Sequence, residues 1–397
     1  MMASHMKIVH FYDGHEKTYR GRGSVPTVVW NIAKGVSDIG HDVSIIERKW
    51  DKLSSKTIKD GVNFHRLNLS IGSDEPWIDI PYEMVGTLKG TIRLIFSRLE
   101  FALKIKPILE RLDPDIIHCH LPFAANLITL FFPKFRHKII YTAHLGETNK
   151  RVTEPMFSPD VFLAKRSSIT TVLNEKMKGA FEESGVDEQK LRIVPNGVDI
   201  DQFMSKKDYN NEKPLVLFVG TVTPRKRVID LVEAASRTKD IDSKFIIAGK
   251  TDIDEEYYSK VKQKILKYGL EDRFEFTGFV SNEHIQKLYS KADIFVLPSQ
   301  EEGFGMVVTE AMAAETPVIG THVGGIPLQI NNGVNGFLYD PGDVNALSSS
   351  LRELLLNPSM RRKLGERGRA IAVQNFSWES ISRKFENIYQ EISDSTE

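Results

Sequence analysis

Residues 7–47, KIVHFYDGHEKTYRGRGSVPTVVWNIAKGVSDIGHDVSIIE, contain the pattern that decides the fold. The apolar run at 7–13 predicts a buried strand, and a glycine-rich loop follows it. A helical pattern then continues to Gly40, a residue type common at helix C-termini. A second apolar run at 41–47 predicts the next strand. The stretch therefore predicts a strand–loop–helix–strand unit.

The same alternation of short β-branched runs and helical stretches continues along the chain. Further strands are expected in the first half at 115–120, 138–144, 168–173 and 191–197, and in the second half at 215–220, 244–249, 274–278, 293–298, 317–321 and 336–339. Helices are expected near the C-terminus at 343–356, 358–373 and 377–392. Such alternation predicts parallel sheets covered by helices on both faces.

Length and composition limit the class of protein. A chain of 397 residues suits two domains, and the polar segment 201–214 is the expected linker. The 53 basic residues balance the 53 acidic ones, which does not favour a nucleic-acid partner. The single cysteine, Cys119, the lack of a recognisable signal peptide and the absence of a membrane-spanning apolar run predict a cytoplasmic protein.

A turn followed by a short helix is expected within 298–320, PSQEEGFGMVVTEAMAAETPVIG. The helix begins near Met306, so the backbone N–H groups of residues 303–306 would lack partners within it. A phosphate suits this position, because the helix dipole favours negative charge and glycine allows close approach. Glu302 and Glu310 are suited to accept hydrogen bonds from sugar hydroxyls. Two glutamates eight residues apart also occur by chance, so the pair alone decides nothing.

The longer stretch PSQEEGFGMVVTEAMAAETPVIGTHVGGIP (298–327) resembles the signature of the family-4 retaining glycosyltransferases. In that signature Gly-Phe-Gly follows a first glutamate, and a second glutamate comes after seven residues. The resemblance covers essentially the whole chain, through ordered blocks that include GRGS with NIAKGVSDIGHDV (31–43), DPDIIHCH (113–120), YTAH (141–144), VPNGVDIDQF (194–203), FVGTVTPRKR (218–227), FTGFVSNEHIQKLYSKADIFVLPS (276–299), NGFLYDPGD (335–343) and FSWESISRKFENIYQEI (376–392).

The resemblance implies the GT-B fold, with two Rossmann-like, doubly wound domains that face a central cleft. The expected domains are an acceptor-side domain at 6–200 and a nucleotide-sugar-binding domain at 214–376, with a C-terminal helix at 377–397 that crosses back to the first domain. In such sheets ligands bind beyond the carboxyl ends of the strands.

The implied activity is transfer of a hexose-type sugar from a nucleotide-diphosphate sugar to a hydroxyl acceptor, such as a glycan, a glycolipid or a lipid-linked sugar. The anomeric configuration is retained through same-face substitution. There are two alternatives. One is a GT-B epimerase or phosphorylase, and the other is a non-catalytic nucleotide-sugar-binding protein. Thr221 and Leu328, which stand where the family usually has arginine and often has glutamate, make the non-catalytic alternative conceivable. The presence together of Lys226, Glu302, Glu310 and His144 argues for catalysis.

Lys226 matches the family lysine that holds the diphosphate, where a cation stabilises the charge that develops on the leaving group. The arginine missing at 221 leaves Arg225 and Arg227 as candidate replacements. Catalytic roles are expected for His144, Lys226 and Glu302. The donor-binding residues implied by the resemblance are Gly23, Ser24, Arg225, Lys226, Val280, Glu302, Gly303, Phe304, Gly305, Met306 and Glu310. Ser24 replaces one of the family's paired glycines, and helix capping is an equal alternative for it.

Three histidines follow neighbouring strands of the first half. His118 and His120 are two residues apart and so point to one face of a strand, and His144 follows the next strand. His144 matches the family histidine near the anomeric carbon, His120 is assigned to the acceptor side, and His118 is expected to be a satisfied, partly buried histidine. A zinc site is disfavoured because no third ligand with suitable spacing is evident.

No metal and no cofactor are predicted. Asp-x-Asp pairs occur at 113–115, 199–201, 240–242 and 252–254, but none lies where the implied fold would place a metal. Residues 85–103 and 130–138 combine apolar and basic side chains, which leaves two interpretations. A helix with one face in the domain core is favoured, and peripheral contact with the inner face of a membrane is the alternative.

Overall fold

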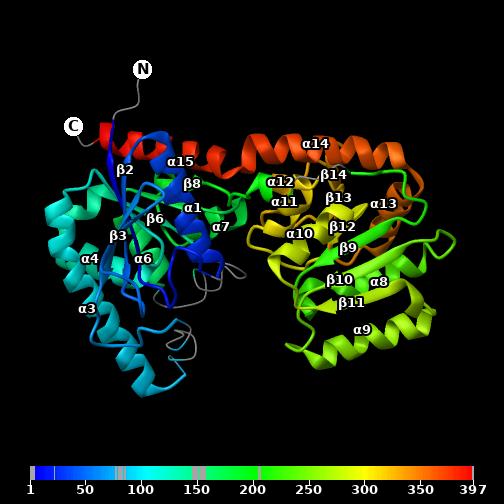
Figure 1. Ribbon diagram of the computed structural model, residues 1–397, viewed down its shortest axis with the longest axis horizontal. Helices are drawn as coiled ribbons and strands as arrows, with labels where there is room; N and C mark the ends of the chain where they lie inside the picture. Colours follow the sequence, from blue (N-terminus) through cyan, green and yellow to red (C-terminus); the bar gives the residue numbers. More distant parts are fainter. Residues whose placement is uncertain are drawn as a thin grey trace. The chain divides into compact units, whose positions relative to one another are not determined.

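Contacts within the chain define two units in the computed structural model (Figure 1). The first comprises Met1–Pro195 and Ile381–Glu397, and the second comprises Asn196–Ser380. The structure describes residues 5–395 apart from 22, 77, 79–83, 85, 145–151, 153–157 and 204–206. In this described part, no helix is long and apolar enough to span a bilayer.

The first unit contains an eight-stranded sheet with the order β3-β4-β2-β1-β5-β6-β7-β8. Its strands are β1 (Lys7–Tyr12), β2 (Asp42–Arg48), β3 (Lys56–Lys59), β4 (Val62–Leu67), β5 (Ile116–Cys119), β6 (Ile139–Thr142), β7 (Ile169–Val172) and β8 (Leu191–Ile193). Its helices include α1 (Ser24–Ile39), α3 (Leu88–Leu112), α4 (Pro122–Phe131), α6 (Pro159–Arg166) and α7 (Glu175–Glu183). The predicted parallel sheet is wrong at one edge, where β3 runs antiparallel to β4. The sequence pattern missed β3 because all four of its residues are exposed.

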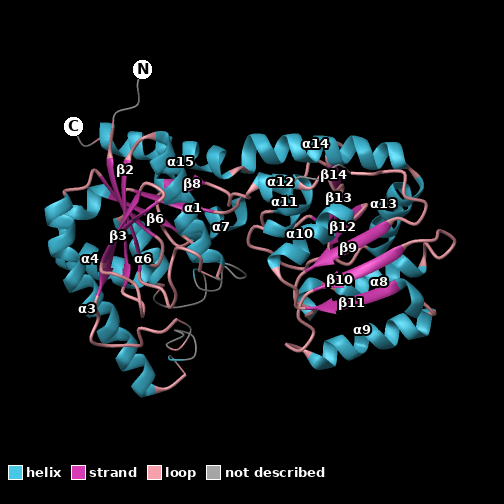
Figure 2. Ribbon diagram, in the orientation of Figure 1, coloured by secondary structure: helices cyan, strands magenta, loops and turns pink. Residues whose placement is uncertain are grey.

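The second unit contains a six-stranded parallel sheet with the order β11-β10-β9-β12-β13-β14. Its strands are β9 (Leu215–Val219), β10 (Lys244–Ala248), β11 (Phe274–Gly278), β12 (Ile294–Leu297), β13 (Val318–Thr321) and β14 (Gly336–Tyr339). Its helices include α8 (Val228–Ser236), α9 (Glu255–Tyr268), α10 (Asn282–Lys291), α11 (Met306–Ala313), α12 (Ile326–Gln329), α13 (Val344–Leu356) and α14 (Pro358–Phe376). Helices pack around each sheet, which confirms the doubly wound fold predicted from the sequence (Figure 2).

The β1–α1–β2 unit is built as the sequence indicates. Strand β1 is buried from Ile8 to Tyr12, and it lies between β2 and β5 in the sheet. Helix α1 buries Val28, Val29, Ile32 and Val36 along one side, a spacing that places apolar side chains on a single helix face. Gly40 ends the helix with a φ of 115°, a backbone conformation that side chains other than glycine rarely adopt.

The C-terminal helix α15 (Trp378–Asp394) packs on the first sheet, although most of the preceding chain belongs to the second unit. It buries Ile381, Phe385, Tyr389 and Ile392 on one face. The Tyr389 hydroxyl lies 2.7 Å from Nδ1 of His118 on β5. The predicted return of this helix to the first domain is therefore confirmed.

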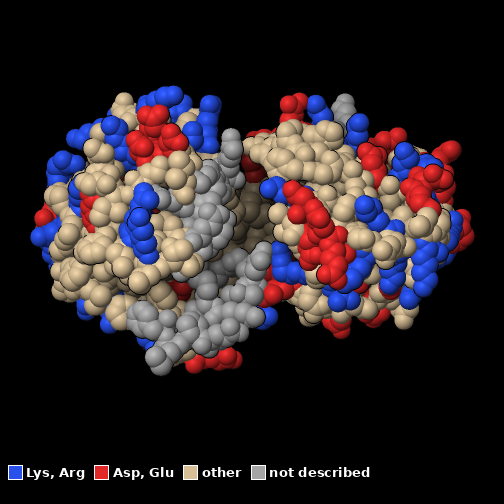
Figure 3. All heavy atoms as spheres, turned by 90° about the horizontal axis from the view of Figure 1, so that it is seen from below, with Lys and Arg blue, Asp and Glu red and all other residues tan. Residues whose placement is uncertain are grey.

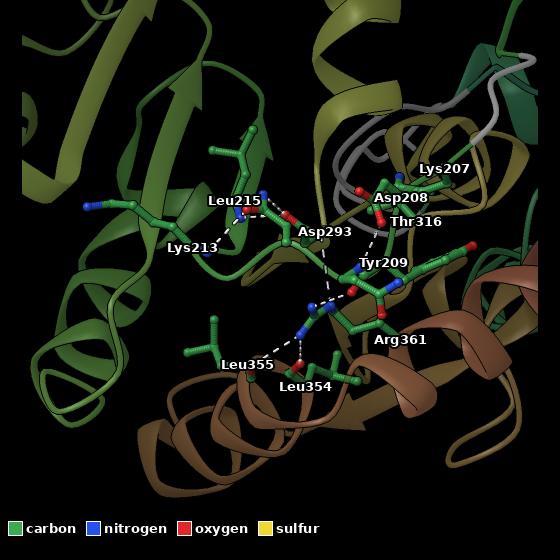
Figure 4. Close-up of polar contacts among 12 residues, drawn as sticks. Lys207, Asp208, Tyr209, Lys213, Leu215, Asp293, Thr316, Leu354, Leu355 and Arg361 are labelled. Carbon is green, nitrogen blue, oxygen red and sulfur yellow. Dashed lines mark hydrogen bonds and ion pairs between the residues drawn. The ribbon is translucent and has the colours of Figure 1, made fainter.

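The segment predicted as a linker, 201–214, is anchored in the second unit over its described residues (Figure 4). The backbone carbonyl of Tyr209 accepts a hydrogen bond from Nη2 of Arg361 at 2.6 Å, and that fully buried guanidinium also donates to two carbonyls at the end of α13. Lys207 donates to two further backbone carbonyls, at 3.1 and 3.3 Å. The boundary between the units consequently falls after Pro195, earlier than predicted.

Helix α3 has one face in the core, as predicted for 85–103, but many of the large apolar residues of that stretch lie on its solvent-exposed face. Its core face includes Leu94, Phe101, Ile105 and Leu109. The exposed large apolar side chains of α3 are Leu88, Ile92, Ile95, Phe96 and Leu103, and α4 adds Leu130 and Phe131. Apolar exposure of this extent on two packed helices calls for a functional explanation.

Charged side chains are mixed on the visible face of each unit (Figure 3). Lysine and arginine are interspersed with aspartate and glutamate, without a broad area of one sign. This distribution agrees with the formal net charge of zero.

Candidate functional site

Two loops of the second unit meet at the carboxyl ends of neighbouring strands. Strand β9 is followed by the 3-10 turn Pro224–Lys226, and β12, which pairs with β9, is followed by the loop that leads into α11. The backbone N–H of Gln300 donates to the carbonyl of Arg225 at 2.7 Å and joins the loops. Nζ of Lys226 forms an ion pair with Oε1 of Glu302. Two predicted catalytic residues, 76 positions apart, are thus in direct contact.

Glu302 has further partners that fix its orientation. The Ser299 hydroxyl donates to its Oε1 at 2.8 Å, and Nη1 of Arg225 lies 3.8 Å from its Oε2. Both Lys226 and Glu302 have side chains that are about one-tenth exposed. Two cations therefore converge on one carboxylate at the edge of the sheet, where an incoming anion would compete with that carboxylate for them.

The structure distinguishes the two candidate replacements for the missing arginine. Arg225 lies beside Glu302, and it also donates to the carbonyl of Glu301 at 2.9 Å. Arg227 instead pairs with Asp230, at 2.7 Å from Nε to Oδ2, and donates to the Gln300 side chain. Arg225 is therefore the better placed of the two for a ligand near Lys226.

The start of α11 offers unpaired donors. Gly305 caps the helix with a φ of 81°, a conformation that costs a non-glycine residue about 1 kcal/mol or more. In the described part of the chain, the backbone N–H groups of Phe304, Gly305 and Met306 have no hydrogen-bond partner. Gly303, whose N–H was predicted to be free as well, has a contact of its own. Three aligned donors and the helix dipole make this end of α11 attractive to a phosphate.

A glycine pair after β13 closes against the loop that carries Glu302. A Cβ atom added at Gly324 would lie 1.8 Å from the Glu302 carbonyl oxygen, so only glycine allows this approach. The Gly325 N–H donates to the Gly303 carbonyl at 3.0 Å. The Gln329 side-chain amide donates to the carbonyls of Phe304 and Gly325. The turn that precedes α11 is therefore held in shape by a second loop.

Glu310 lies on α11, and its Oε2 accepts a hydrogen bond from the Tyr289 hydroxyl of α10 at 2.8 Å. Desolvation by burial raises the pKa of Glu310 above its ordinary value. Val280, the residue expected to contact a nucleobase through its backbone, is half-buried just after β11. Both predicted donor-binding residues are thus found in loops or helices that follow the strands.

In the first unit, His10, His120 and His144 form a hydrogen-bonded row that we call the histidine chain. Nδ1 of His10 lies 3.0 Å from Nε2 of His120, and Nδ1 of His120 lies 3.1 Å from Nε2 of His144. His10 and His120 are fully buried, whereas His144 is half-buried. Desolvation lowers the pKa of His10 to about 3 and that of His144 to about 4, so the side chains of the histidine chain are neutral at pH 7.

The orphaned end of the histidine chain favours one arrangement of its protons. Nε2 of His10 is buried and has no partner in the described residues. An unpaired N–H donor there would be costly, whereas a lone pair is less so, because buried acceptors are more often left unsatisfied. With Nε2 as the acceptor, His10 donates to His120 and His120 donates to His144. His144 then keeps an N–H on Nδ1, at the more exposed end of the chain.

His120 does not fit its predicted place on the acceptor side. It is fully buried, and both of its ring nitrogens already have histidine partners. The physical reason is that the rings of His10, His118 and His144 pack against it. His120 therefore contacts His10 and His144 through its ring nitrogens and is not open to an acceptor.

The structure provides a third nitrogen near His118 and His120 that the sequence pattern missed. One ligand atom from each of His10, His118 and His120 lies within 4.8 Å of the others. However, His118 already bonds to the Tyr389 hydroxyl and to Oγ1 of Thr142, at 2.7 and 2.6 Å. The prediction that His118 is satisfied is confirmed, and it is buried completely. A metal would have to break these bonds, so the geometry favours a hydrogen-bonded cluster.

The glycine loop of the first unit differs from its prediction. The Gly23 N–H donates to Oε1 of Glu16 at 2.8 Å and so is not free for a phosphate. Gly23 occupies the N-cap of α1, and no side chain caps the helix. Ser24 is exposed and is the first residue of α1, so the capping role considered for it is wrong.

The family is decided by comparison with known sequences. Residues 199–371 match the family described as Glycosyl transferases group 1, and residues 25–202 match Glycosyltransferase Family 4. An uncharacterised glycosyltransferase of Methanocaldococcus jannaschii is 30% identical over 350 residues, which cover 85% of this chain and 92% of that protein. The chain belongs to the group 1 glycosyltransferases.

Two further proteins are similar to this glycosyltransferase. N-acetyl-alpha-D-glucosaminyl L-malate synthase of Bacillus anthracis is 26% identical, over 74% of this chain and 79% of that protein. The crystal structure of Anabaena HepE in complex with UDP superimposes with a TM-score of 0.72 and 20% identity, over 97% of this chain and 100% of that one. The likeness of the structures confirms the GT-B fold predicted from the sequence.

Proposed function

We propose that the protein transfers a hexose-type sugar from a nucleotide-diphosphate sugar to a hydroxyl acceptor, with retention of the anomeric configuration. The main support for this proposal is the Lys226–Glu302 ion pair beside the free backbone N–H groups at the start of α11. A diphosphate matches both features, because it can accept from the amides and attract the cations. The crystal structure of Anabaena HepE in complex with UDP supports a donor of this class.

In the proposed reaction, the bond between the anomeric carbon and the phosphate oxygen breaks while a bond from the acceptor oxygen forms on the same face. The proton of the acceptor hydroxyl passes to the leaving phosphate. Lys226 and Arg225 stabilise the charge that grows on the diphosphate. Glu302 binds sugar hydroxyls, and Glu310 binds the ribose. No covalent sugar–enzyme intermediate and no essential metal are involved.

His144 contributes from the first unit in this proposal. Because the histidine chain is neutral at pH 7, His144 presents a hydrogen-bond donor and not a full positive charge. A neutral donor can hold a sugar hydroxyl without repelling the positive charge that develops at the anomeric carbon. The tautomer set by His10 and His120 supplies that donor.

The experiment is incubation with a panel of nucleotide-diphosphate sugars, with and without candidate acceptors, in the presence of EDTA. Release of nucleoside diphosphate together with an α- or β-linked product that keeps the donor's configuration supports the proposal. Epimerised sugar would support the alternative of a GT-B epimerase. Tight binding with no turnover in any combination would support a non-catalytic binding protein.

We also propose that the first unit contacts an anionic membrane through the exposed face of α3. Ile92, Ile95 and Phe96 are 46%, 59% and 52% exposed, and the exposed Lys89 and Arg93 lie among them. Apolar side chains can enter the interface while basic ones attract anionic lipid. A cytoplasmic protein that touches the inner face of the membrane, acting in glycan or glycolipid synthesis, fits this surface.

Liposome co-sedimentation tests the membrane proposal. Wild-type protein should sediment with vesicles that contain phosphatidylglycerol and less with neutral vesicles. Ile95→Asp should lower the bound fraction severalfold. Leu266→Asp is the matched control, because Leu266 is 66% exposed on α9 of the second unit. Equal binding of both variants, or no dependence on anionic lipid, would refute the proposal.

A further inference from the structure

A partly open cavity lies in the first unit, beyond the ends of β1 and β2 and against α3. The space that it leaves for the centres of water-sized molecules is about 20 Å³, within a wider hollow of about 340 Å³ that includes open solvent. Arg48, Trp50, Arg93, Ser97 and Arg98 are among the residues that line it. None of these residues belongs to the site described above. The described lining residues include one carboxylate, Glu75, and it is exposed.

Arg98 is a buried cation with unused donors. It is 7% exposed, and its Nε lies 3.3 Å from Oδ2 of Asp13. In the described part of the chain, the terminal nitrogens Nη1 and Nη2 have no hydrogen bond or ion pair. Nε is buried without a hydrogen bond, whereas the terminal nitrogens are not buried, so their four N–H groups are open to a ligand or to water.

Trp50 adds a second unsatisfied donor to the same cavity. It is 3% exposed, and its buried Nε1–H has no partner in the described residues. The ion pair with Asp13 leaves Nε of Arg98 without a hydrogen bond, and it accounts neither for the terminal nitrogens of Arg98 nor for Trp50. The cavity therefore has donors without acceptors, which is what a missing anion would leave.

Arg48 shapes the wall of this cavity. Its Nη2 donates to the Ile71 carbonyl at 2.6 Å and its Nη1 to the Ser73 carbonyl at 2.7 Å. A Cβ atom at Gly72, between these two residues, would lie 2.5 Å from the guanidinium, so glycine allows the loop to wrap around it. Arg93 is exposed and lines the cavity, where it adds positive charge.

We propose that this cavity binds a carboxylate or phosphate group of the acceptor. Arg98 would hold two oxygens of the anion through its terminal nitrogens, and Trp50 would donate to one of them. The role as acceptor subsite rests on the proposed function, whereas the binding of an anion does not. The same chemistry is found in small soluble acids or phosphates and in lipid headgroups.

Isothermal titration with inorganic phosphate and with malate tests the inference at constant ionic strength, because salt screens nonspecific attraction. Glycerol is the neutral control ligand. Trp50→Phe keeps the ring and removes the donor, so it should weaken anion binding about tenfold, as expected for a hydrogen bond to a charged group. Arg98→Lys keeps the charge beside Asp13 and should also weaken binding about tenfold or more.

Arg93→Gln covers the case in which the buried variants do not fold, because Arg93 is exposed. It should weaken binding about threefold, the effect expected of an exposed charge. Lys89→Gln is its matched control on the same helix, and it should leave binding unchanged because Lys89 does not line the cavity. Absence of anion binding to the wild-type protein, or equal binding by Arg93→Gln and Lys89→Gln, would overturn the inference for soluble anions.

Vesicles that contain phosphatidylglycerol separate the two sources. If phosphate and malate do not bind, but Trp50→Phe lowers vesicle binding relative to wild type, the anion is a lipid headgroup and the inference stands. If neither soluble anions nor vesicles distinguish Trp50→Phe from wild type, the inference is wrong. Release of nucleoside diphosphate is measured separately, so failure of donor turnover with intact anion binding would refute only the proposed function.

Discussion

The buried histidines should make the first unit sensitive to acid, and His10 allows this effect to be measured. The pKa of His10 is about 3 in the folded protein and 6.5 when exposed. Between these values the unfolded chain binds more protons than the folded one, so the free energy of unfolding falls as the pH falls. The stability is fully present above pH 6.5 and declines below it, through the window that ends near pH 3.

At pH 5 the effect of His10 alone has a definite size. This pH is 1.5 units below the unfolded pKa and above the folded one, so His10 costs about 2 kcal/mol relative to neutral pH. The other buried histidines act in the same direction, because burial also lowers the pKa values of His118 and His120. Their hydrogen bonds couple the titrations, so their contributions should not be added to that of His10.

The perturbation is His10→Asn, which removes the titrating ring and keeps a polar atom near the position of Nδ1. The substitution has a packing cost at every pH, so the quantity to compare is the change in unfolding free energy between pH 7.5 and pH 5. Buried carboxylates such as Asp13 and Glu47 titrate in both proteins, and their effects cancel. The variant should lose about 2 kcal/mol less than the wild type.

Hydrogen exchange followed by mass spectrometry suits a chain of two units, because it reports on β1 and β5 without assuming a single unfolding transition. After correction for the intrinsic effect of pH, exchange of peptides from these strands should rise about 30-fold less in His10→Asn than in wild type. Peptides from β9 and β12 serve as the internal control. Identical pH dependence in the two proteins would refute the assignment of a neutral, desolvated His10.

Three further predictions concern the second unit. Lys226→Ala should lower kcat/KM for the donor by about 10²–10³, because a cation at the leaving group is lost, as steady-state release of nucleoside diphosphate will show. Tyr289→Phe frees Glu310 from its hydrogen bond and should raise the donor KM about three- to tenfold with little change in kcat. Gly305→Ala should cost about 1–2 kcal/mol of stability, measured by urea unfolding, and also abolish detectable UDP binding in titration calorimetry.

Matched controls make these predictions specific. Lys213→Ala removes an exposed lysine of the same unit and should leave kinetics unchanged. Tyr258→Phe removes a tyrosine hydroxyl on α9 and should not alter the KM. Gly269→Ala introduces the same strain at a φ of 59° with nothing within 4 Å of the new Cβ, so it should lose stability but retain UDP binding. If a control variant shows the same change in kinetics or in UDP binding as the variant it is paired with, the role proposed for that residue is wrong.

The sequence predicted the strands that carry strong apolar runs, and it predicted a glycine-containing turn that leads into a short helix near Met306. It could not predict that His10 belongs with His118 and His120. They are more than 100 residues apart, and β1 and β5 become neighbours only through the strand order of the sheet. His10 lies opposite His118 in that pairing, so the local pattern contained no signal for the cluster.

Other features escaped prediction because they depend on three-dimensional contacts. The sequence placed Arg225 and Arg227 on equal terms, and only the pairing of Arg227 with Asp230 separates them. The donor-rich cavity combines residues from β2 and α3 with residues from the loops that follow β1, β2 and β4, and periodicity does not reveal unsatisfied donors. Helical spacing on α3 likewise could not show which of its apolar residues face solvent.

The division of the chain has a consequence for biosynthesis. The ribosome makes the first sheet early, but Tyr389, the partner of His118, is made only after the whole of the second unit. Nascent chains of this protein should therefore complete the later-made unit while the earlier one still lacks its final helix, which reverses the usual N-to-C order. A stop codon placed before Ile381 would damage the part of the molecule that was translated first.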